Sequence, residues 1–494
     1  MSILRRLVDS KLSHPKIYVM ASIAFASLVW LMHRQVEIVT FELPLEYREN
    51  VDLWRSYLLW KGQNPFSYQF YPTSNSQYGI VYPLIVSWFY SVCGFSFLAP
   101  RLVSFIFLFP PIFLYIYIAL REKVSTLNIG LIAAVALFAE TLHSGNFLAM
   151  PNALGMTLFC FAVLLPWLLR FSLISLVLTV FLSCLGVLTK LYFGFGAIYI
   201  FVYLIATGQW LKGAQMACFG IFGFITTYAT VYYFLPAFIE SNILLNVSTA
   251  RWNLEHLWLQ IRYFIEALFG LFLLLLIFKR SLIQNGLFSW RNPITFGFFF
   301  FSFLLIKMGG SDGQFYLYFQ HLLLPFVMAA VIRVCALHKR RLLVSLFLCL
   351  NCMLLWKTEA ERFSLSSVRN RFSVIGREVS LTIANSSPVL LDAPLSYFKI
   401  IEGLVPDETG QMAGLSEFGS GEIRKLYIMH NDNVREKLKQ HQYNYVYTDE
   451  FQSSSLYNHD LINRCYQKNG EYKLKLIEQE FFVYRWHPKQ CTEF

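Results

Sequence analysis

Charged residues are scarce in this chain of 494 residues, and that scarcity argues against a soluble protein. They make up 14% of the sequence, whereas 56% is hydrophobic and 18% is aromatic. Soluble domains carry about 25% charged residues, so the composition predicts a polytopic membrane protein. The formal net charge is +11, but no basic stripe with interleaved aromatics is present, and nucleic-acid binding is not indicated.

Several short catalytic motifs are absent as well. The chain has no Walker loop, no GxGxxG after a strand, no HExxH and no GxSxG. Its 9 Cys show no CxxC or zinc-finger spacing, and Asp and His do not cluster with metal spacing, so we expect no metal and no cofactor. Cys465 and Cys491 alone lie in the polar tail, where a disulfide between them is one alternative.

Twelve apolar segments are each long enough, or nearly so, to cross a hydrocarbon layer of about 30 Å as a helix. They lie near residues 17–33, 80–97, 101–120, 126–142, 153–169, 173–189, 191–207, 216–238, 258–278, 288–306, 320–337 and 341–356. Four basic residues precede the first segment, which we interpret as a retained anchor. They place the N-terminus in the cytoplasm and the following loop outside.

One segment is better placed along the outer membrane surface than across the membrane. If residues 80–97 lie there, the basic turns after later segments all fall inside, as membrane topology demands. Tyr78, Tyr82, Trp88 and Tyr90 also have the amphipathic aromatic character of interfacial residues. The sequence therefore predicts about eleven spans and a C-terminus outside the cytoplasm.

The tail changes character near residue 357. Short strand-like runs alternate with glycine-marked loops and one helical stretch, which predicts a small α/β domain outside the membrane. The strand-like runs are Val389–Asp392, Lys425–Ile428, Tyr445–Tyr447 and Phe481–Tyr484, and the helical stretch is Asn433–Gln440. The predicted fold is an α-helical polytopic membrane domain over residues 1–356, with interfacial helices in a first external loop at 34–100, and an extracytoplasmic α/β domain over 357–494.

The first external loop is crowded with acids and aromatics. An acidic run that ends at Asp52 is followed by Gly62-Gln63-Asn64-Pro65-Phe66, by Tyr82-Pro83-Leu84, by Gly94-Phe95-Ser96 and by Arg101-Leu102-Val103-Ser104. This arrangement resembles the GT-C membrane glycosyltransferases, in particular the aminoarabinose-transferase-like and protein-O-mannosyltransferase-like branch. The similarity covers the N-terminal ~110 residues well and the rest of the membrane part loosely.

The resemblance implies an enzyme of a bacterial-type inner membrane. It would transfer a sugar from a polyprenyl-phosphate donor to a lipid, glycan or protein acceptor on the outer face. Such a transfer needs a base for the acceptor hydroxyl, and Glu49, Asp52 and Glu46 are the candidates, with Glu49 first. The competing interpretation is that these acids pair with Arg48 and Arg55 on a solvated loop. Which acid acts stays open.

Candidate substrate-binding residues all fall on the predicted outer side. Lysines at span ends are candidates for holding the donor phosphate, or else they extend to the surface as ordinary snorkelling side chains. Aromatic residues there form either a sugar platform or an interfacial belt. Where some relatives have an Asp after the third span, this chain has an Asn, which cannot act as a base. The candidates are Tyr78, Tyr82, Asn152, Lys190, Arg251, Lys307, Asp312, Tyr318 and His321.

Three alternative functions fit the sequence less well than the enzyme. A transporter or flippase of lipid-linked sugars should show two similar halves and polar residues inside spans, and the sequence shows neither. An O-antigen-polymerase-like enzyme should have its large outer loop late in the chain, whereas here the long loop comes first. A non-catalytic scaffold is opposed by the acidic loop alone.

Overall fold

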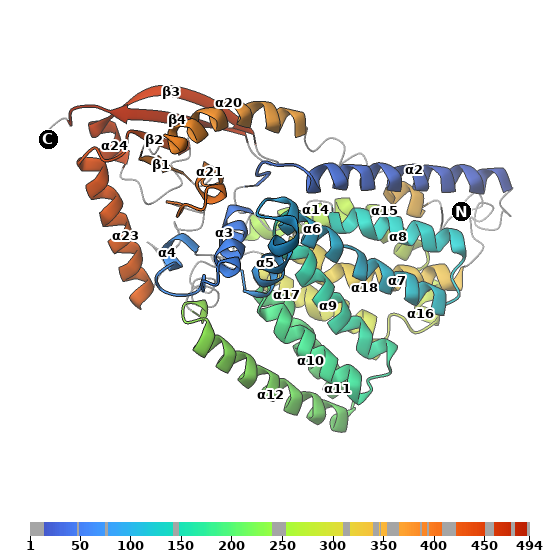
Figure 1. Cartoon of the computed structure of the whole chain (residues 1–494). Helices are drawn as coiled ribbons and strands as arrows, with labels where there is room; N and C mark the ends of the chain where they lie inside the picture. Colours follow the sequence, from blue (N-terminus) through green and yellow to red (C-terminus); the bar gives the residue numbers. More distant parts are fainter. Residues whose placement is uncertain are drawn as a thin grey trace.

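The computed structural model contains a body of apolar helices and, beside it, a smaller part built on a β-sheet (Figure 1). It describes residues 14–46, 49–74, 78–141, 148–239, 253–309, 317–338, 345, 347–352, 365–385, 388–392, 395–407, 421–449, 459–475 and 480–491. Helices α3, α4 and α5 of the first loop lie between the two parts (Figure 1).

The helical body follows the apolar segments of the sequence. Its elements are α2 (His14–Val39), α3 (Glu49–Trp60), α4 (Tyr71–Ser74), α5 (Val81–Cys93), α6 (Leu98–Phe107), α7 (Phe109–Arg121), α8 (Thr126–Thr141), α9 (Asn152–Leu168), α10 (Leu173–Val187), η1 (Leu191–Gly194), α11 (Phe195–Ala206), α12 (Trp210–Phe234), α14 (Leu254–Ala267), α15 (Phe269–Ile277), α16 (Lys279–Gln284), α17 (Pro293–Gly309) and α18 (Leu317–Leu337). Helices α8, α9 and α18 are buried on most sides, which is why their sequences are apolar without a strong polar face.

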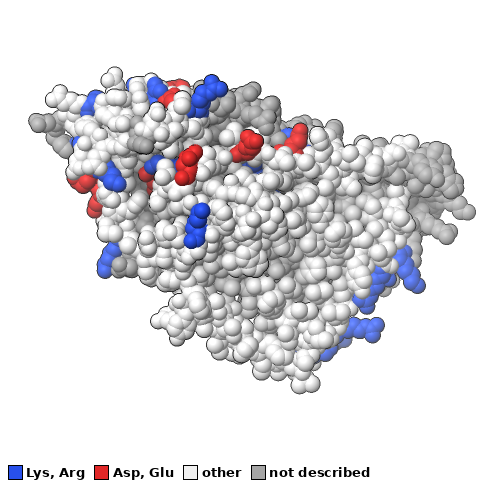
Figure 2. Space-filling model, in the orientation of Figure 1, with Lys and Arg blue, Asp and Glu red and all other residues white. Residues whose placement is uncertain are grey.

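Two helical stretches of the described residues are long and apolar enough to cross a membrane, namely Leu98–Arg121 and Trp210–Phe234. Shorter apolar helices accompany them, and the number of spans stays a prediction. Helix α12 leaves large apolar side chains exposed, among them Phe222, Phe224 and Tyr233. A soluble protein rarely exposes so large an apolar surface. Charged side chains gather at the upper left and the lower right of the view, with a broad uncharged band between them (Figure 2).

Helix α5 is too short to span. Its 13 residues reach about 20 Å, against about 30 Å of hydrocarbon. It packs against α3 and α6, and the placement of residues 80–97 along the membrane surface stays a prediction.

The smaller part is a four-stranded mixed sheet with helices around it. Strands β1 (Val389–Leu391), β2 (Tyr445–Asp449), β3 (Tyr466–Lys475) and β4 (Glu480–Pro488) lie in the order β1-β2-β4-β3. The β1–β2 pair is parallel and the other two pairs are antiparallel. Its helices are α20 (Leu365–Ala384), α21 (Tyr397–Ile401), α23 (Gly421–Lys439) and α24 (His459–Cys465). A C-terminal α/β sheet is therefore confirmed.

One strand prediction was wrong. Residues Lys425–Ile428 belong to helix α23, of which only the later part was predicted as helical. Tyr427, Val434 and Leu438 are buried, a spacing of seven and four residues that puts all three on one helical face. The short apolar run alone could not distinguish this face from a strand.

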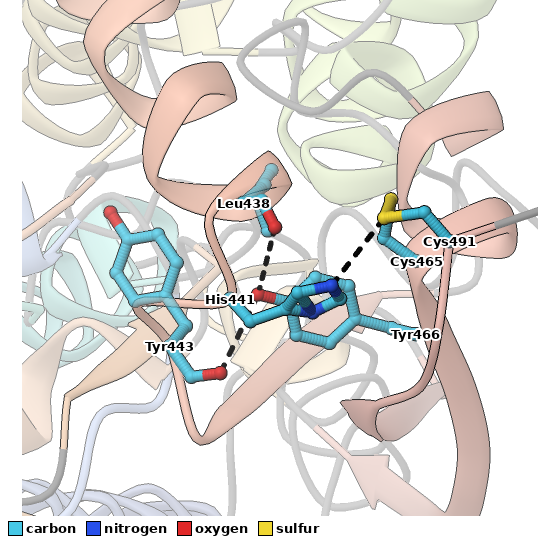
Figure 3. Close-up of a disulfide and its surroundings, with 6 residues drawn as sticks. All are labelled: Leu438, His441, Tyr443, Cys465, Tyr466 and Cys491. Atoms are coloured by element: carbon cyan, nitrogen blue, oxygen red, sulfur yellow. Dashed lines mark hydrogen bonds between the residues drawn. A yellow bond between two sulfur atoms is a disulfide. The ribbon is translucent and has the colours of Figure 1, made fainter.

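A disulfide joins Cys465, at the end of α24, to Cys491 beyond β4 (Figure 3). Nε2 of His441 lies 3.4 Å from the sulfur of Cys491, and the Tyr466 hydroxyl donates to the Leu438 carbonyl at 3.3 Å. The bridge thus holds the C-terminal strand against α23 and α24, and the pairing considered from the sequence is confirmed.

The sheet domain contacts the first loop through α21. The Tyr397 hydroxyl donates to the Glu42 carbonyl at 3.0 Å, and its ring stacks on Phe97 with centroids 4.9 Å apart. The C-terminal part therefore packs directly on the segment that carries the acidic cluster.

Candidate functional site

A completely buried ion pair joins the first external loop to helix α6. Glu49 opens α3, and Arg101 lies on α6; both side chains have no exposed surface. The Arg101 Nε lies 2.9 Å from Oε1 of Glu49 and the second guanidinium nitrogen 2.8 Å from Oε2, a bidentate pair. The same guanidinium donates to the carbonyls of Ile38, Phe41 and Leu43.

Glu49 accepts further hydrogen bonds from the backbone. The Leu45 amide donates to Oε2 at 2.7 Å and the Ala149 amide to Oε1 at 2.8 Å. Both carboxylate oxygens are thus engaged by a cation and by amides, which fixes the position of the side chain. This carboxylate fastens the first loop to α6 and to the start of α9.

Asp52, one helical turn after Glu49, has a different environment. It is fully buried, and among the described residues neither of its carboxylate oxygens has a hydrogen-bond partner. Burial raises the pKa of Asp52 from 3.8 to about 7, while the positive charges of Arg55 and Lys190 oppose that rise. A carboxyl group with such a pKa is half ionised near neutral pH, as a general base requires.

Lys190 comes from a distant part of the chain, between α10 and η1. It is buried, and its amino group donates to Oδ1 of Asn152, at the start of α9, at 3.2 Å. The ammonium lies over the rings of Tyr78 at 4.8 Å and Tyr192 at 5.2 Å. Cation–π contacts and the amide oxygen hold the ammonium in place.

Arg55, on α3, holds the part of the first loop near Tyr78 against this cluster. Its Nε donates to the Ser74 carbonyl at 2.7 Å and a terminal nitrogen donates to the Tyr78 carbonyl at 2.6 Å. Next to it, the Gly79 amide donates to the Thr189 carbonyl at 3.0 Å. The chain at Tyr78 is therefore pinned against the segment that carries Lys190.

Gly79 is required by this close approach. A Cβ at this position would lie 1.8 Å from the Leu188 carbonyl oxygen. We expect Gly79→Ala to displace Tyr78 from Lys190 and to lower the free energy of unfolding by about 1–3 kcal/mol, as overpacking does. Gly130→Ala is the matched control, because nothing lies within 4 Å of its Cβ. Thermal unfolding of both variants checks this, and equal unfolding temperatures would contradict it.

His321, on α18, completes the described cluster. It is fully buried, and its Nδ1 lies 2.8 Å from the hydroxyl of Tyr192. Its ring also packs against Phe193 with centroids 5.4 Å apart. Because Tyr192 faces Lys190, the histidine supports the aromatic wall beside the cation.

The structure thus places most of the sequence candidates in one region. Tyr82 is buried on α5, and its hydroxyl donates to the Pro100 carbonyl at 2.7 Å. Glu46 is nearly buried, and its charge acts on Asp52. Arg251 and Asp312 lie outside the described residues, as do the side chains of Lys307 and Tyr318, so their roles stay predictions.

Two members of the cluster were not among the predicted site residues. Arg55 was treated only as a partner for the loop acids, although it follows Asp52 by three residues, nearly one helical turn. Tyr192 stands two positions after Lys190. The short spacing between a lysine in an apolar region and an aromatic residue could have indicated a cation–π contact between them.

The complete arrangement can be compared with known proteins. No protein-family model and no curated protein matches this chain. Among solved structures, ArnT from Cupriavidus metallidurans bound to undecaprenyl phosphate matches with a TM-score of 0.56, over 96% of this chain and 98% of that chain, at 11% identity. This chain has the ArnT fold. The apo state of ArnT matches with a TM-score of 0.55, over 95% and 98% of the two chains, again at 11% identity.

ArnT is an aminoarabinose transferase of the GT-C superfamily. The resemblance drawn from the first 110 or so residues is therefore confirmed as a likeness of fold, and it extends over nearly the whole chain. The ArnT fold includes both the helical body and the region of the C-terminal sheet, because the match leaves out only a small share of either chain.

Proposed function

We propose that this chain is a membrane glycosyltransferase. It transfers a sugar from a polyprenyl-phosphate donor to a lipid, glycan or protein acceptor of the cell envelope, on the extracytoplasmic face. The ArnT fold supports this class of reaction, and one of the two matching ArnT structures holds undecaprenyl phosphate. The fold gives no support to the alternative of a flippase for lipid-linked sugars.

The observation that carries the proposal is the environment of Asp52. An unpartnered, buried carboxylate with a pKa near 7 has no structural task among the described residues. Functional sites are where such perturbed groups cluster. Glu49, the first candidate from the sequence, is occupied by Arg101 and backbone amides, so we assign the base to Asp52.

The proposed step inverts the sugar carbon. Asp52 takes the proton of the acceptor hydroxyl, the acceptor oxygen forms a bond to the anomeric carbon, and the bond from that carbon to the phosphate oxygen breaks. The electron pair leaves with the polyprenyl phosphate. Lys190 stabilises the negative charge that develops on this phosphate, as fixed cations do for departing anions. Since Asp52 has no exposed surface, a covering segment must move for the acceptor to reach it.

The disulfide supports the proposed orientation. Disulfides persist in oxidising compartments such as the bacterial periplasm, and the Cys465–Cys491 bridge lies in the C-terminal sheet domain. That domain packs on the first loop through Tyr397. Both would then face the periplasm, with the N-terminus in the cytoplasm.

The test uses the full chain in nanodiscs, with polyprenyl-phosphate sugars as donors and lipids and glycans as acceptors, all extracted from the host envelope, and measures release of polyprenyl phosphate. We expect Lys190→Gln to lower kcat/KM by roughly 10²–10³, the loss typical of removing one transition-state contact. Lys61→Gln is the control, because Lys61 is an exposed lysine of the same loop.

Two results would contradict the proposal. Wild-type protein that releases no polyprenyl phosphate from any extracted donor would remove the enzymatic function. Equal activity of Lys190→Gln and Lys61→Gln would leave the function in place and remove the assigned role of Lys190.

A further inference from the structure

A basic cavity lies at the end of the helical body that is remote from Asp52. Its volume is about 380 Å³, and its lining includes Arg121, Arg170, Lys212 and Arg333, with Glu122 as the one acid among the described residues that line it. Four cations around one carboxylate leave an excess of positive charge, which attracts an anion.

The position of the cavity follows from the helices that line it. Helix α9 starts at Asn152, beside Lys190, and ends at Leu168, which lines the cavity. Its 17 residues span about 25 Å, close to the thickness of the hydrocarbon layer. Helix α18 likewise carries His321 at its start and Arg333 towards its end. The cavity therefore lies at the membrane surface opposite the proposed active site.

Two of the cations are built into the walls. Arg121, the last residue of α7, donates to the Leu168 carbonyl at 2.8 Å. Arg333 pairs with Glu122 at 2.6 Å, both side chains being partly exposed. These contacts join the ends of α7, α9 and α18 and fix the shape of the opening.

The other two cations, Arg170 and Lys212, have no acid partner among the described residues. Lys212 donates to the Arg170 carbonyl at 3.3 Å. Arg170 and Phe171 both adopt left-handed backbone conformations, with φ of 53° and 54°. Non-glycine residues rarely do so, because the conformation is strained. The turn after α9 thus keeps a strained geometry that places Arg170 at the cavity.

Exposed apolar residues adjoin both of these cations in the chain. Leu169 precedes Arg170 and is 45% exposed; Trp210 and Leu211 precede Lys212 and are 66% and 76% exposed. An exposed tryptophan and exposed leucines beside cations are typical of the level at which lipid head groups meet acyl chains. A soluble anion would not need this apolar border, whereas a lipid would lay its chains on it.

We propose that the cavity binds the phosphate head group of an anionic phospholipid from the leaflet opposite the active site. Arg170 and Lys212 contact the phosphate, and the acyl chains lie along the apolar border formed by Leu169, Trp210 and Leu211. The lipid site is separate from the donor site, and a bound lipid ties α9, α12 and α18 together at their ends. This proposal does not depend on the proposed transferase activity.

The test measures retained lipids by native mass spectrometry of the full chain released from nanodiscs of phosphatidylcholine with phosphatidylglycerol. The variant Arg170→Asn/Lys212→Gln removes both charges, and Asn tolerates the left-handed backbone. We expect wild-type protein to retain one phosphatidylglycerol and the variant to bind it at least about tenfold more weakly, as the loss of charge-assisted contacts implies. Lys212→Arg should keep the binding.

Arg280→Gln is the matched control. Arg280 is an exposed cation of α16, whose Ser281 Oγ lies 3.1 Å from Nε2 of His338, just beyond α18. It lies at the same end of the molecule but does not line the cavity. Equal retention of phosphatidylglycerol by the double variant, the control and the wild type would overturn the proposal. The proposal would also be overturned if the cavity retained inorganic phosphate in place of phosphatidylglycerol, because a soluble anion would then be the ligand.

Discussion

Replacing Asp52 with Asn is expected to abolish glycosyl transfer and at the same time to raise thermal stability. The amide is nearly isosteric with the carboxyl group but cannot accept a proton from the acceptor, so a loss of roughly 10²–10⁴ in kcat is expected. The amide also removes an ionisable group from a site where it is fully buried and has no hydrogen-bond partner among the described residues.

The stability change follows from the direction of the pKa shift. Burial raises the pKa of Asp52 from 3.8 to about 7. Between these values the folded protein keeps the proton that the unfolded chain releases, so the free energy of unfolding falls as pH rises from about 4 to 7. Above pH 7 the folded protein contains an ionised, unpartnered carboxylate. Asn lacks this penalty, and the unfolding temperature of Asp52→Asn should exceed that of the wild type at pH 8.

Activity should depend on pH through the same group. The base acts only when ionised, so kcat/KM of the wild type should rise as pH increases through about 7. Donor-release assays and thermal unfolding across pH 5 to 9 test both expectations. Glu42→Gln, an exposed acid of the same loop, should change neither. An Asp52→Asn protein that retains full activity would remove Asp52 from the mechanism.

Breaking the Glu49–Arg101 pair is expected to have the opposite effect on stability. Removal of one partner from a buried ion pair leaves the other charge uncompensated and costs about 3–5 kcal/mol. Arg101 also donates to the Ile38 carbonyl near the end of α2 and to two carbonyls of the segment between α2 and α3. Arg101→Leu should therefore unfold at a much lower temperature and accumulate poorly in the membrane.

Glu49→Gln separates the structural role of Glu49 from a catalytic one. We expect it to lower both the unfolding temperature and the activity, because α3 loses its attachment to α6 and to Ala149. Glu436→Gln removes an exposed ion pair with Lys439 and should change stability by no more than about 1 kcal/mol. A Glu49→Gln protein of wild-type stability and no activity would make Glu49 the base instead.

The C-terminal sheet domain was only partly predictable. Alternating and β-branched runs were enough to find β1, β2 and β4, because strand propensity reflects half-buried surfaces. Lys425–Ile428 was misassigned as a strand, because a run of so few apolar residues is compatible with a strand and with part of a buried helix. The Cys465–Cys491 pairing could be established only from the folded sheet domain, because the sequence gives the spacing of the two cysteines but not their distance in space.

The sequence by itself determined the membrane character, the acidic first loop and the resemblance to GT-C enzymes, because these depend on composition and on residues close together in the chain. It also placed Glu49 and Asp52 three positions apart. Only the tertiary structure distinguished their environments. Two partners of Glu49 lie 52 and 100 residues away, at Arg101 and Ala149, and of the two positive charges that act on Asp52, those of Arg55 and Lys190, the second comes from a distant part of the chain. Whether a carboxylate is paired or merely desolvated depends on such distant contacts, and local sequence does not contain them.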